Sequence, residues 1–408
     1  MPTTDSLTVF WGELLSNPIP LELSFGSCGY NCAYCFAGLN KAHRNADPGQ
    51  ALRLIRDRNS RTTIEAYLLA QGYPVCVSNR SDPFAPRNAV HSLPVLQVMA
   101  ETGIPVFLQT KGGAAAYQAL DFLPPSAWYV TVSFTDDALR QRIEPHAPSL
   151  DERWALIDAI VAAGSSVLIG VNPMVPEWLP NPEALFRKAV EHGVECVVLA
   201  DLHLNSKQTT AMTEWKREAL GPEIIAASRK RKWVEAENLY VHEVGEVAAD
   251  CGLLVDLPYR FKPSRYPEVY RKHYAKTFPI MQDFVNAVAE SADDIFSFAD
   301  FWGVVGPHFP AGQFRIQHYI GTSAKQLTAT TKMPPRMTYG DLMQIIWGHP
   351  EIFKFHPAWS FGFALATKAG SDNEVGLVDE NGLPWVVYDR AGRFREGAAE
   401  YVEQEHKP

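Results

Sequence analysis

The sequence predicts an α/β fold, a partial (β/α)6 barrel followed by a C-terminal mixed α+β accessory region. In the first half of the chain, short β-branched runs alternate with longer amphipathic stretches, which is the pattern of repeated βα units around a parallel sheet. Beyond Leu204 this alternation gives way to long helical stretches, and then to a segment rich in aromatic residues and proline. We therefore expect a core at residues 1–205 and an accessory region at residues 206–408.

Six strands and six helices make up the predicted barrel. Ser149 or Asp151 can cap the clearest helix, Glu152 lies in its first turn, and Gly164 follows its last apolar residue. The predicted strands are Leu21–Phe25, Val75–Ser78, Pro105–Gln109, Trp128–Ser133, Ser166–Val171 and Glu195–Leu199. The predicted helices are Ile64–Ala70, Leu93–Thr102, Ala114–Leu120, Asp137–Ile143, Asp151–Ala163 and Pro182–His192.

The second half has fewer signals. Helical stretches run through Glu214–Asn238 and Val241–Asp250, before a short apolar run at Leu253–Val255. Near the end of the chain, Glu374–Val387 reads as a hairpin with Asn381-Gly382 at its turn.

Composition narrows the class of protein. The 408 residues are 46% hydrophobic, which is ordinary for a globular chain with a sizeable core. No apolar run approaches the ~18 residues of a membrane span, and the first residues lack a signal-peptide pattern. We therefore expect a cytoplasmic protein with no membrane partner. The net charge of −9 does not favour a general duplex-binding surface, which usually has a basic excess.

Three cysteines follow the first predicted strand with the spacing CxxxCxxC: Cys28, Cys32 and Cys35. Thiolates at such spacing are natural ligands of an iron–sulfur cluster. In a [4Fe–4S] cube, three protein ligands leave one iron open to a small molecule, which favours chemistry over simple electron transfer. A structural zinc site would want four ligands in pairs, and six cysteines in 408 residues are too sparse for a disulfide framework. Plain structural thiols remain an alternative.

With this motif, the sequence resembles the radical S-adenosylmethionine (SAM) enzymes, and its wider pattern is similar to the branch that includes spore photoproduct lyase. The resemblance covers residues 20–205, and four further segments carry it in the family's order: Ser81–Pro86, Leu108–Lys111, Thr131–Phe134 and Ile143–Arg153. It implies a [4Fe–4S] cluster on the three cysteines, with SAM as its partner. Reductive cleavage of SAM would release a 5′-deoxyadenosyl radical that abstracts hydrogen from a substrate. An external one-electron reductant of the flavodoxin or ferredoxin type is implied too.

Polar residues at the carboxyl ends of the predicted strands are candidates for binding SAM. Ser81 follows the second strand, Lys111 follows the third, and Ser133 closes the fourth. By resemblance these positions correspond to SAM-contacting residues. Lys111 fits the SAM carboxylate by charge, and the serines fit as small hydrogen-bond partners. The alternative for each is a solvated surface side chain.

Three further residues are candidates at the same site. Asn172, at the end of the fifth strand, fits a ribose hydroxyl as a hydrogen-bond partner. Tyr34 and Phe36 flank the last cysteine, where they would shield the cluster, contact adenine or simply pack in the core.

Three charged residues of the same segments are predicted to have structural roles. Asp82 is expected to hold its loop. Glu144 and Arg153 are expected to form an ion pair that positions the following helix.

The substrate stays open. The loop Ser78–Ser81 lacks the cysteine hydrogen donor that the resemblance to spore photoproduct lyase would imply, so repair of thymine dimers is not predicted. We retain a weak preference for a nucleobase or nucleotide, inherited from the family likeness. A peptide or small metabolite is the alternative within enzymes. A non-catalytic iron–sulfur protein, for electron transfer or sensing, is the alternative of a different class; it would be expected to have a fourth cluster ligand.

Overall fold

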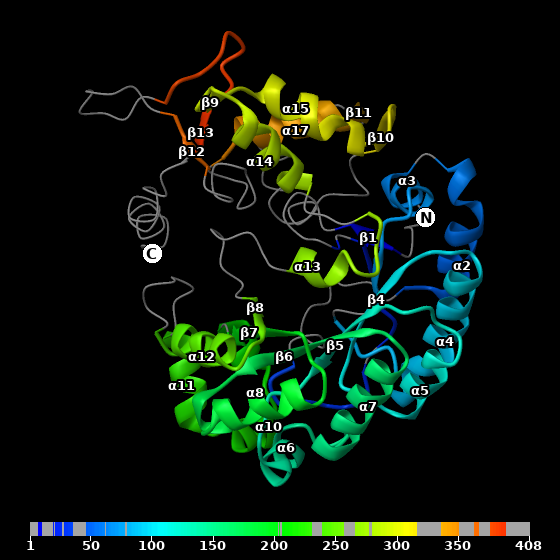
Figure 1. Ribbon diagram of the computed structural model, residues 1–408, viewed down its shortest axis with the longest axis vertical. Coiled ribbons are helices and arrows are strands. Elements are labelled where there is room, and N and C mark those ends of the chain that lie inside the picture. Colours follow the sequence, from blue (N-terminus) through cyan, green and yellow to red (C-terminus); the bar gives the residue numbers. More distant parts are fainter. Residues whose placement is uncertain are drawn as a thin grey trace.

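An eight-stranded sheet organises the chain in the computed structural model (Figure 1). The structure describes residues 7–9, 19, 21–26, 28–35, 46–61, 63–77, 80–202, 204, 206–230, 239–256, 266–276, 280–315, 336–350, 363–366 and 376–388. The strands follow one another in chain order across the sheet, β1 to β8. Strand β1 (Thr8–Val9) is antiparallel to β2, and the remaining neighbours are parallel. The sheet is therefore open, and the predicted α/β class with a partial barrel is confirmed.

The parallel strands lie close to the predicted ones, because short β-branched runs suit a sheet that is buried on both faces. They are β2 (Leu21–Leu23), β3 (Val75–Val77), β4 (Val106–Thr110), β5 (Ala127–Thr131), β6 (Ser166–Met174), β7 (Cys196–Asp201) and β8 (Leu254–Asp256). Strand β8 was predicted only as an apolar run of the accessory region. It pairs with β7 and makes a seventh parallel strand. The division of the chain at residues 205 and 206 stays a prediction.

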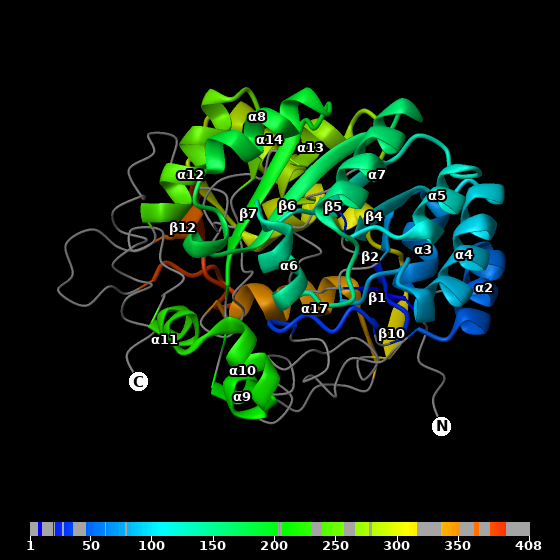
Figure 2. The ribbon, with the colours of Figure 1, turned by 90° about the horizontal axis from the view of Figure 1, so that it is seen from below.

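Helices cover the outer face of this sheet (Figures 1 and 2). They are α2 (Pro48–Asp57), α3 (Ile64–Ala70), α4 (Pro86–Glu101), α5 (Ala114–Leu120), α6 (Asp137–Ile143), α7 (Leu150–Ala162), α8 (Pro182–Glu191) and α12 (Leu239–Asp250). Helix α7 begins with the predicted capping box: the Ser149 hydroxyl accepts from the Glu152 amide, and the Glu152 carboxylate accepts from the Ser149 amide.

Two helices differ from the prediction for local reasons. Helix α4 begins at Pro86 instead of Leu93, because a proline fits the first helical position; the helix continues through Pro94. The stretch predicted from Glu214 is divided at Gly221, whose φ of +83° interrupts it. It forms α10 (Glu214–Leu220) and α11 (Pro222–Lys230), after α9 (Ser206–Ala211), and residues 231–238 lie outside the described part.

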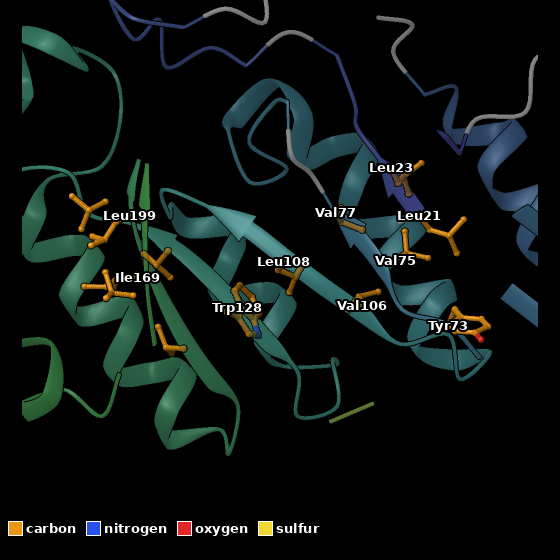
Figure 3. Packing of buried hydrophobic residues seen from close by; sticks show 14 of the residues in the cluster. Leu21, Leu23, Tyr73, Val75, Val77, Val106, Leu108, Trp128, Ile169 and Leu199 are labelled. Atoms are coloured by element: carbon orange, nitrogen blue, oxygen red, sulfur yellow. The ribbon is translucent and has the colours of Figure 1, made fainter. Parts of the chain in front are cut away.

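Successive side chains of each strand point to opposite faces of the sheet, and this alternation creates two separate cores. Leu108, Trp128 and Ile169 belong to the large core between sheet and helices, shown in Figure 3. Tyr129 and Leu168, their neighbours along the strands, face the inner side with a smaller cluster. That cluster continues into helix α13 (Tyr266–Tyr270) and the turn after it. Its members are Ile19, Cys76, Phe107, Ala127, Tyr129, Leu168, Cys196, Val198, Val269, Tyr270 and Tyr274.

The segment after α13 closes the amino-terminal end of the sheet. The Tyr274 hydroxyl donates to the Val106 carbonyl at 2.6 Å and accepts from the Ala127 amide at 2.9 Å. His273 is 2.9 Å from the Ser166 hydroxyl. Because these partners begin β4, β5 and β6, the segment fills the amino-terminal end and leaves the carboxyl ends of the strands for the loops.

The accessory region is mixed α+β, as predicted. Its elements are α14 (Ile280–Glu290), β9 (Ile295–Phe296), α15 (Phe298–Val305), β10 (Gln313–Arg315), β11 (Arg336–Thr338), α17 (Tyr339–Gly348), β12 (Phe363–Leu365) and β13 (Val386–Tyr388). An aromatic core that includes Phe284, Phe301 and Trp347 holds them together. The predicted turn at Asn381-Gly382 is confirmed by the antiparallel bridge between Val378 and Pro384. Among the described helices, none has the length and apolar character needed to cross a bilayer.

Replacing Gly170 by alanine should destabilise the sheet. A Cβ at this position would lie 2.0 Å from the Tyr129 ring, which covers the glycine on the inner face. We expect a loss of about 1–3 kcal/mol in the free energy of unfolding, as for other overpacked cores, measured by urea denaturation. Gly303→Ala is the control, since nothing lies within 4 Å of its added Cβ in α15. Equal stability of the Gly170 variant and the wild type would contradict the packing described here.

Candidate functional site

The three motif cysteines lie on one loop at the carboxyl end of β2. Cys32 is buried, Cys28 and Cys35 are half-buried, and all three are free thiols. Asn31, between the first two, has a φ of +53°, a left-handed conformation that asparagine tolerates better than most residues. A turn bond from the Cys35 amide to the Cys32 carbonyl, at 3.2 Å, folds the second half of the loop. The loop thus brings the three thiols into one small region.

Two neighbouring segments hold this cysteine loop in place. The Tyr30 hydroxyl donates to the Gly112 carbonyl, at 2.6 Å, in the loop after β4. From the end of α6, the Ile143 carbonyl accepts from the Ala33 amide at 2.8 Å, and the His146 amide donates to the Tyr30 carbonyl at 3.4 Å. The position of the thiols therefore depends on the ends of β4 and α6, far away in the sequence.

Burial keeps the free thiols of Cys28 and Cys32 protonated. Burial and the nearby Asp82 raise the pKa of Cys28 to about 11, and burial with Glu144 raises the pKa of Cys32 well above its usual range. Lys111 acts in the opposite direction on both thiols. Since metals bind thiolates, a metal that displaces these protons must supply the compensating positive charge, and Lys111 assists it.

The donor set fits a cluster better than a single ion. Within the described residues, no three His, Cys, Asp or Glu side chains are arranged to hold one metal ion. An iron–sulfur cluster binds each thiolate to a different iron, so its ligands need not converge on one point. Three free thiols on one partly buried loop suit that requirement.

A buried charge network lies against the cysteine loop. Arg153 and Glu144 are both fully buried and form an ion pair through Arg153 Nη2 and Glu144 Oε2. Arg153 also donates to the carbonyls of Thr131, at 2.9 Å, and Pro148, at 3.0 Å. The predicted ion pair is thus present, and Arg153 links it to the end of β5.

The other carboxylate oxygen of Glu144 faces the site. The Tyr34 hydroxyl donates to Glu144 Oε1, and the Lys111 ammonium lies 3.5 Å from the same atom. Burial alone would raise the pKa of Glu144, but the charges of Arg153 and Lys111 and the bonds from Tyr34 and Arg153 hold it at about 2. Glu144 is therefore ionised at neutral pH.

Asp82 has the structural role that the sequence predicts. Its carboxylate accepts from the Phe84 amide at 3.0 Å, the Thr110 hydroxyl at 2.9 Å and the Lys111 amide at 2.5 Å. These bonds fix the loop after β3 to the end of β4, and so fix the backbone of Lys111.

The structure brings four of the predicted SAM residues to one edge. Ser81, Lys111, Ser133 and Asn172 lie at or beyond the carboxyl halves of β3, β4, β5 and β6. The Ser81 hydroxyl donates to the Phe25 carbonyl, and this hydrogen bond links the loop after β3 to the residues that follow β2. Ser133 is fully buried, and within the described residues its Oγ has no hydrogen-bond partner. That orphaned hydroxyl leaves a polar group available at the site.

The remaining predictions meet different surroundings. Asn172 is exposed and hydrogen-bonds to the side chain of Tyr129 on the inner face. The centre of the Tyr34 ring lies 5.9 Å from the centre of the Trp178 ring. The Lys111 ammonium lies 5.7 Å from the centre of the Tyr34 ring. Phe36 lies outside the described residues.

Sequence reasoning did not assign Glu144 to the site. It treated Glu144 as part of the scaffold because its pairing with Arg153 could be read locally. Its contacts with Lys111 and Tyr34 span large separations, 110 residues for Tyr34, and have no sequence signal. The place of Glu144 within the Ile143–Arg153 segment was the available hint.

Comparisons with other proteins' sequences give distant relatives. No family model matches the chain. It is 24% identical over 222 residues to uncharacterised proteins of Mycobacterium tuberculosis and Mycobacterium bovis. The aligned part is 50% of this chain and 65% of each relative, so the chain spans less than two thirds of their length.

Solved structures with a similar fold include three radical SAM enzymes. Streptococcus suis SuiB bound to S-adenosylmethionine matches with a TM-score of 0.41 and 17% identity, over 64% of this chain and 56% of that one. Spore photoproduct lyase complexed with dinucleoside spore photoproduct matches with a TM-score of 0.45 and 14% identity, over 59% of this chain and 77% of that one. A domain of a pyruvate-formate lyase-activating enzyme from Bacteroides vulgatus matches with a TM-score of 0.29 and 10% identity, over 42% of this chain and 92% of that one. At these identities the likeness concerns the fold alone.

The ionised Glu144 predicts a specific acid sensitivity. Because its folded-state pKa, about 2, lies below its ordinary 4.5, its stabilising contribution is full above pH 4.5 and is lost as the pH falls towards 2. Between pH 6 and pH 3.5 this group alone should remove on the order of 1 kcal/mol from the free energy of unfolding. Urea denaturation of the cluster-free protein measures it, and Glu144→Gln should lose less over the same interval. Parallel pH profiles of the two proteins would contradict the assignment.

Proposed function

We propose that this protein is a radical SAM enzyme, with a [4Fe–4S] cluster on Cys28, Cys32 and Cys35 and SAM at the open iron. The observation that carries the proposal is the placement of three free thiols, one buried and two half-buried, on one loop beside the Lys111 ammonium. When bound and reduced, the cluster supplies an electron that cleaves SAM to methionine and a 5′-deoxyadenosyl radical, which abstracts hydrogen from the substrate.

The chain's own residues would bind and orient the cofactor. Lys111 offers a positive charge to the SAM carboxylate, and Ser133 offers a hydroxyl that has no partner in the described part of the chain. Ser81 can still accept a hydrogen bond, since its proton is used on Phe25. Asn172 is the proposed ribose partner, and Tyr34 and Phe36 are the proposed aromatic neighbours.

A non-catalytic iron–sulfur protein is supported less well. The remaining cysteines lie away from the motif: Cys76 is buried in β3, Cys196 is buried in β7, and Cys251 follows α12. None of them is part of the cysteine loop, so the loop supplies three thiol ligands. An open iron and an adjacent cation favour a cofactor with a carboxylate.

The proposed partners are a one-electron reductant of the flavodoxin or ferredoxin type and an organic substrate. A nucleobase or nucleotide remains the preferred substrate class, on the family likeness alone. Near the barrel mouth, Arg80 is paired with the buried Glu22, Nε to Oε2 at 3.5 Å, which neutralises one cation that a phosphate would otherwise meet. The predicted cytoplasmic location stays a prediction.

Anaerobic reconstitution with iron and sulfide tests the proposal. After dithionite reduction, SAM should change the electron paramagnetic resonance spectrum of the cluster, and 5′-deoxyadenosine should form. Cys32→Ala should lose cluster and product together, whereas Cys251→Ala should retain both because that residue lies at the end of α12. Absence of both SAM-dependent signals in the wild type would refute the enzymatic function. Full turnover by the Cys32 variant would refute the ligand assignment.

Substrate class can be separated by coupled turnover. Reduced enzyme with SAM should form 5′-deoxyadenosine faster when its own substrate is present, because the radical then has a hydrogen to abstract. We expect stimulation by a panel of nucleotides and oligonucleotides, measured by chromatography, and none by peptides of mixed sequence. Stimulation by peptides alone would overturn the nucleobase preference and leave the cluster assignment intact.

A further inference from the structure

We propose that Glu144 is a positioning residue that keeps the Lys111 ammonium at the cysteine loop, where it binds the carboxylate of SAM. This inference rests on the proposed function and deepens it. It concerns a residue that is neither a proposed cluster ligand nor a proposed SAM contact, and it follows from how the two oxygens of one buried carboxylate are divided between different partners.

Arg153 fixes the carboxylate. Its guanidinium is anchored by the Thr131 and Pro148 carbonyls and pairs with Glu144 Oε2, and both charged side chains are fully buried. A guanidinium held at three points cannot follow a moving partner. The direction in which Glu144 Oε1 points is therefore set by the scaffold.

That second oxygen holds Lys111 without using up its donors. The ammonium is 3.5 Å from Oε1, longer than the 2.7–2.9 Å typical of a charge-assisted hydrogen bond. Within the described residues the ammonium donates no hydrogen bond, although it has three N–H groups. Its backbone amide is fixed by Asp82 at 2.5 Å. Lys111 is thus held at both ends and keeps its donors for an incoming anion.

The sign of the local charge explains why Glu144 is needed. Arg153 and Lys111 are both cations, and Glu144 lies between them as the shared counter-charge. Without it, two cations in a buried site would repel each other across a weakly screening medium. Arg153 is fixed by backbone carbonyls, so Lys111 is the one that would leave. The ammonium would then swing away from the cysteine loop.

The test is a double-mutant cycle on SAM affinity. The readout is the SAM-induced change in the spectrum of the reconstituted, reduced cluster, titrated with SAM. We expect Glu144→Gln to weaken binding about tenfold and Lys111→Met to weaken it at least as much. Because Glu144 acts through Lys111, the double variant should bind no more weakly than Lys111→Met alone. Losses that multiply in the double variant would overturn the proposal.

Decarboxylated SAM separates positioning from a general structural effect. This analogue lacks the group that Lys111 is proposed to bind, so its affinity should be the same for the wild type, Glu144→Gln and Lys111→Met. A loss of affinity for the analogue in the Glu144 variant, equal to the loss for SAM, would show that the substitution only damages the site.

Two further variants guard against misfolding. Glu144→Asp keeps the buried charge but shortens the side chain, so it should assemble a full cluster and weaken SAM binding by a smaller factor. Asp137→Asn removes a carboxylate at the start of α6, which pairs with Arg140 at 2.9 Å, and should leave SAM affinity unchanged. Wild-type affinity in both Glu144 variants would refute the inference. If wild-type protein with a full cluster shows no response to SAM, the proposed function itself fails.

Discussion

The buried ion pair between Arg153 and Glu144 joins the scaffold to the cysteine loop. Removing two charges from water is costly, and the pair is tolerated only because nearly every donor and lone pair has a partner. Arg153 uses backbone carbonyls at the end of β5 and before α7, while Glu144 uses Tyr34 and Lys111. The segment that carries Glu144 also bonds to the loop through the Ile143 carbonyl. One carboxylate therefore couples α6, β4, β5 and the motif cysteines.

The electrostatic character of this edge favours anions. Burial keeps the free thiols of Cys28 and Cys32 protonated, so thiolate ligation requires positive charge nearby. Lys111 supplies part of it, and its pKa is raised because Glu144 and Cys32 outweigh the effect of burial. Two carboxylates lie at the same edge: Glu144 is paired with Arg153 and Lys111, and hydrogen bonds from backbone and hydroxyl donors occupy the carboxylate of Asp82. The edge can thus accept thiolates and a carboxylate without an uncompensated acid.

Much of the fold could be predicted because its signals are local. The β-branched runs gave each strand from β2 to β7 to within a few residues, and the capping box marked the start of α7. Predictions differed where a local signal had two meanings. Pro86 could end a preceding segment or begin a helix, and α4 begins there instead of at the predicted Leu93; the run Leu253–Val255 was too short to separate a sheet strand from a loop. Pairing with β7 is what makes it a strand.

For the candidate site, the sequence by itself determined the spacing of Cys28, Cys32 and Cys35 and the polar residues that follow successive strands. These features are contiguous or recur with the βα unit, so they can be read along the chain. Tertiary structure decided which of them meet. Lys111, Glu144 and Tyr34 come together because parallel pairing places the carboxyl ends of the strands at one edge and α6 returns there. No periodicity encodes a contact across 110 residues; only packing of the whole sheet creates it.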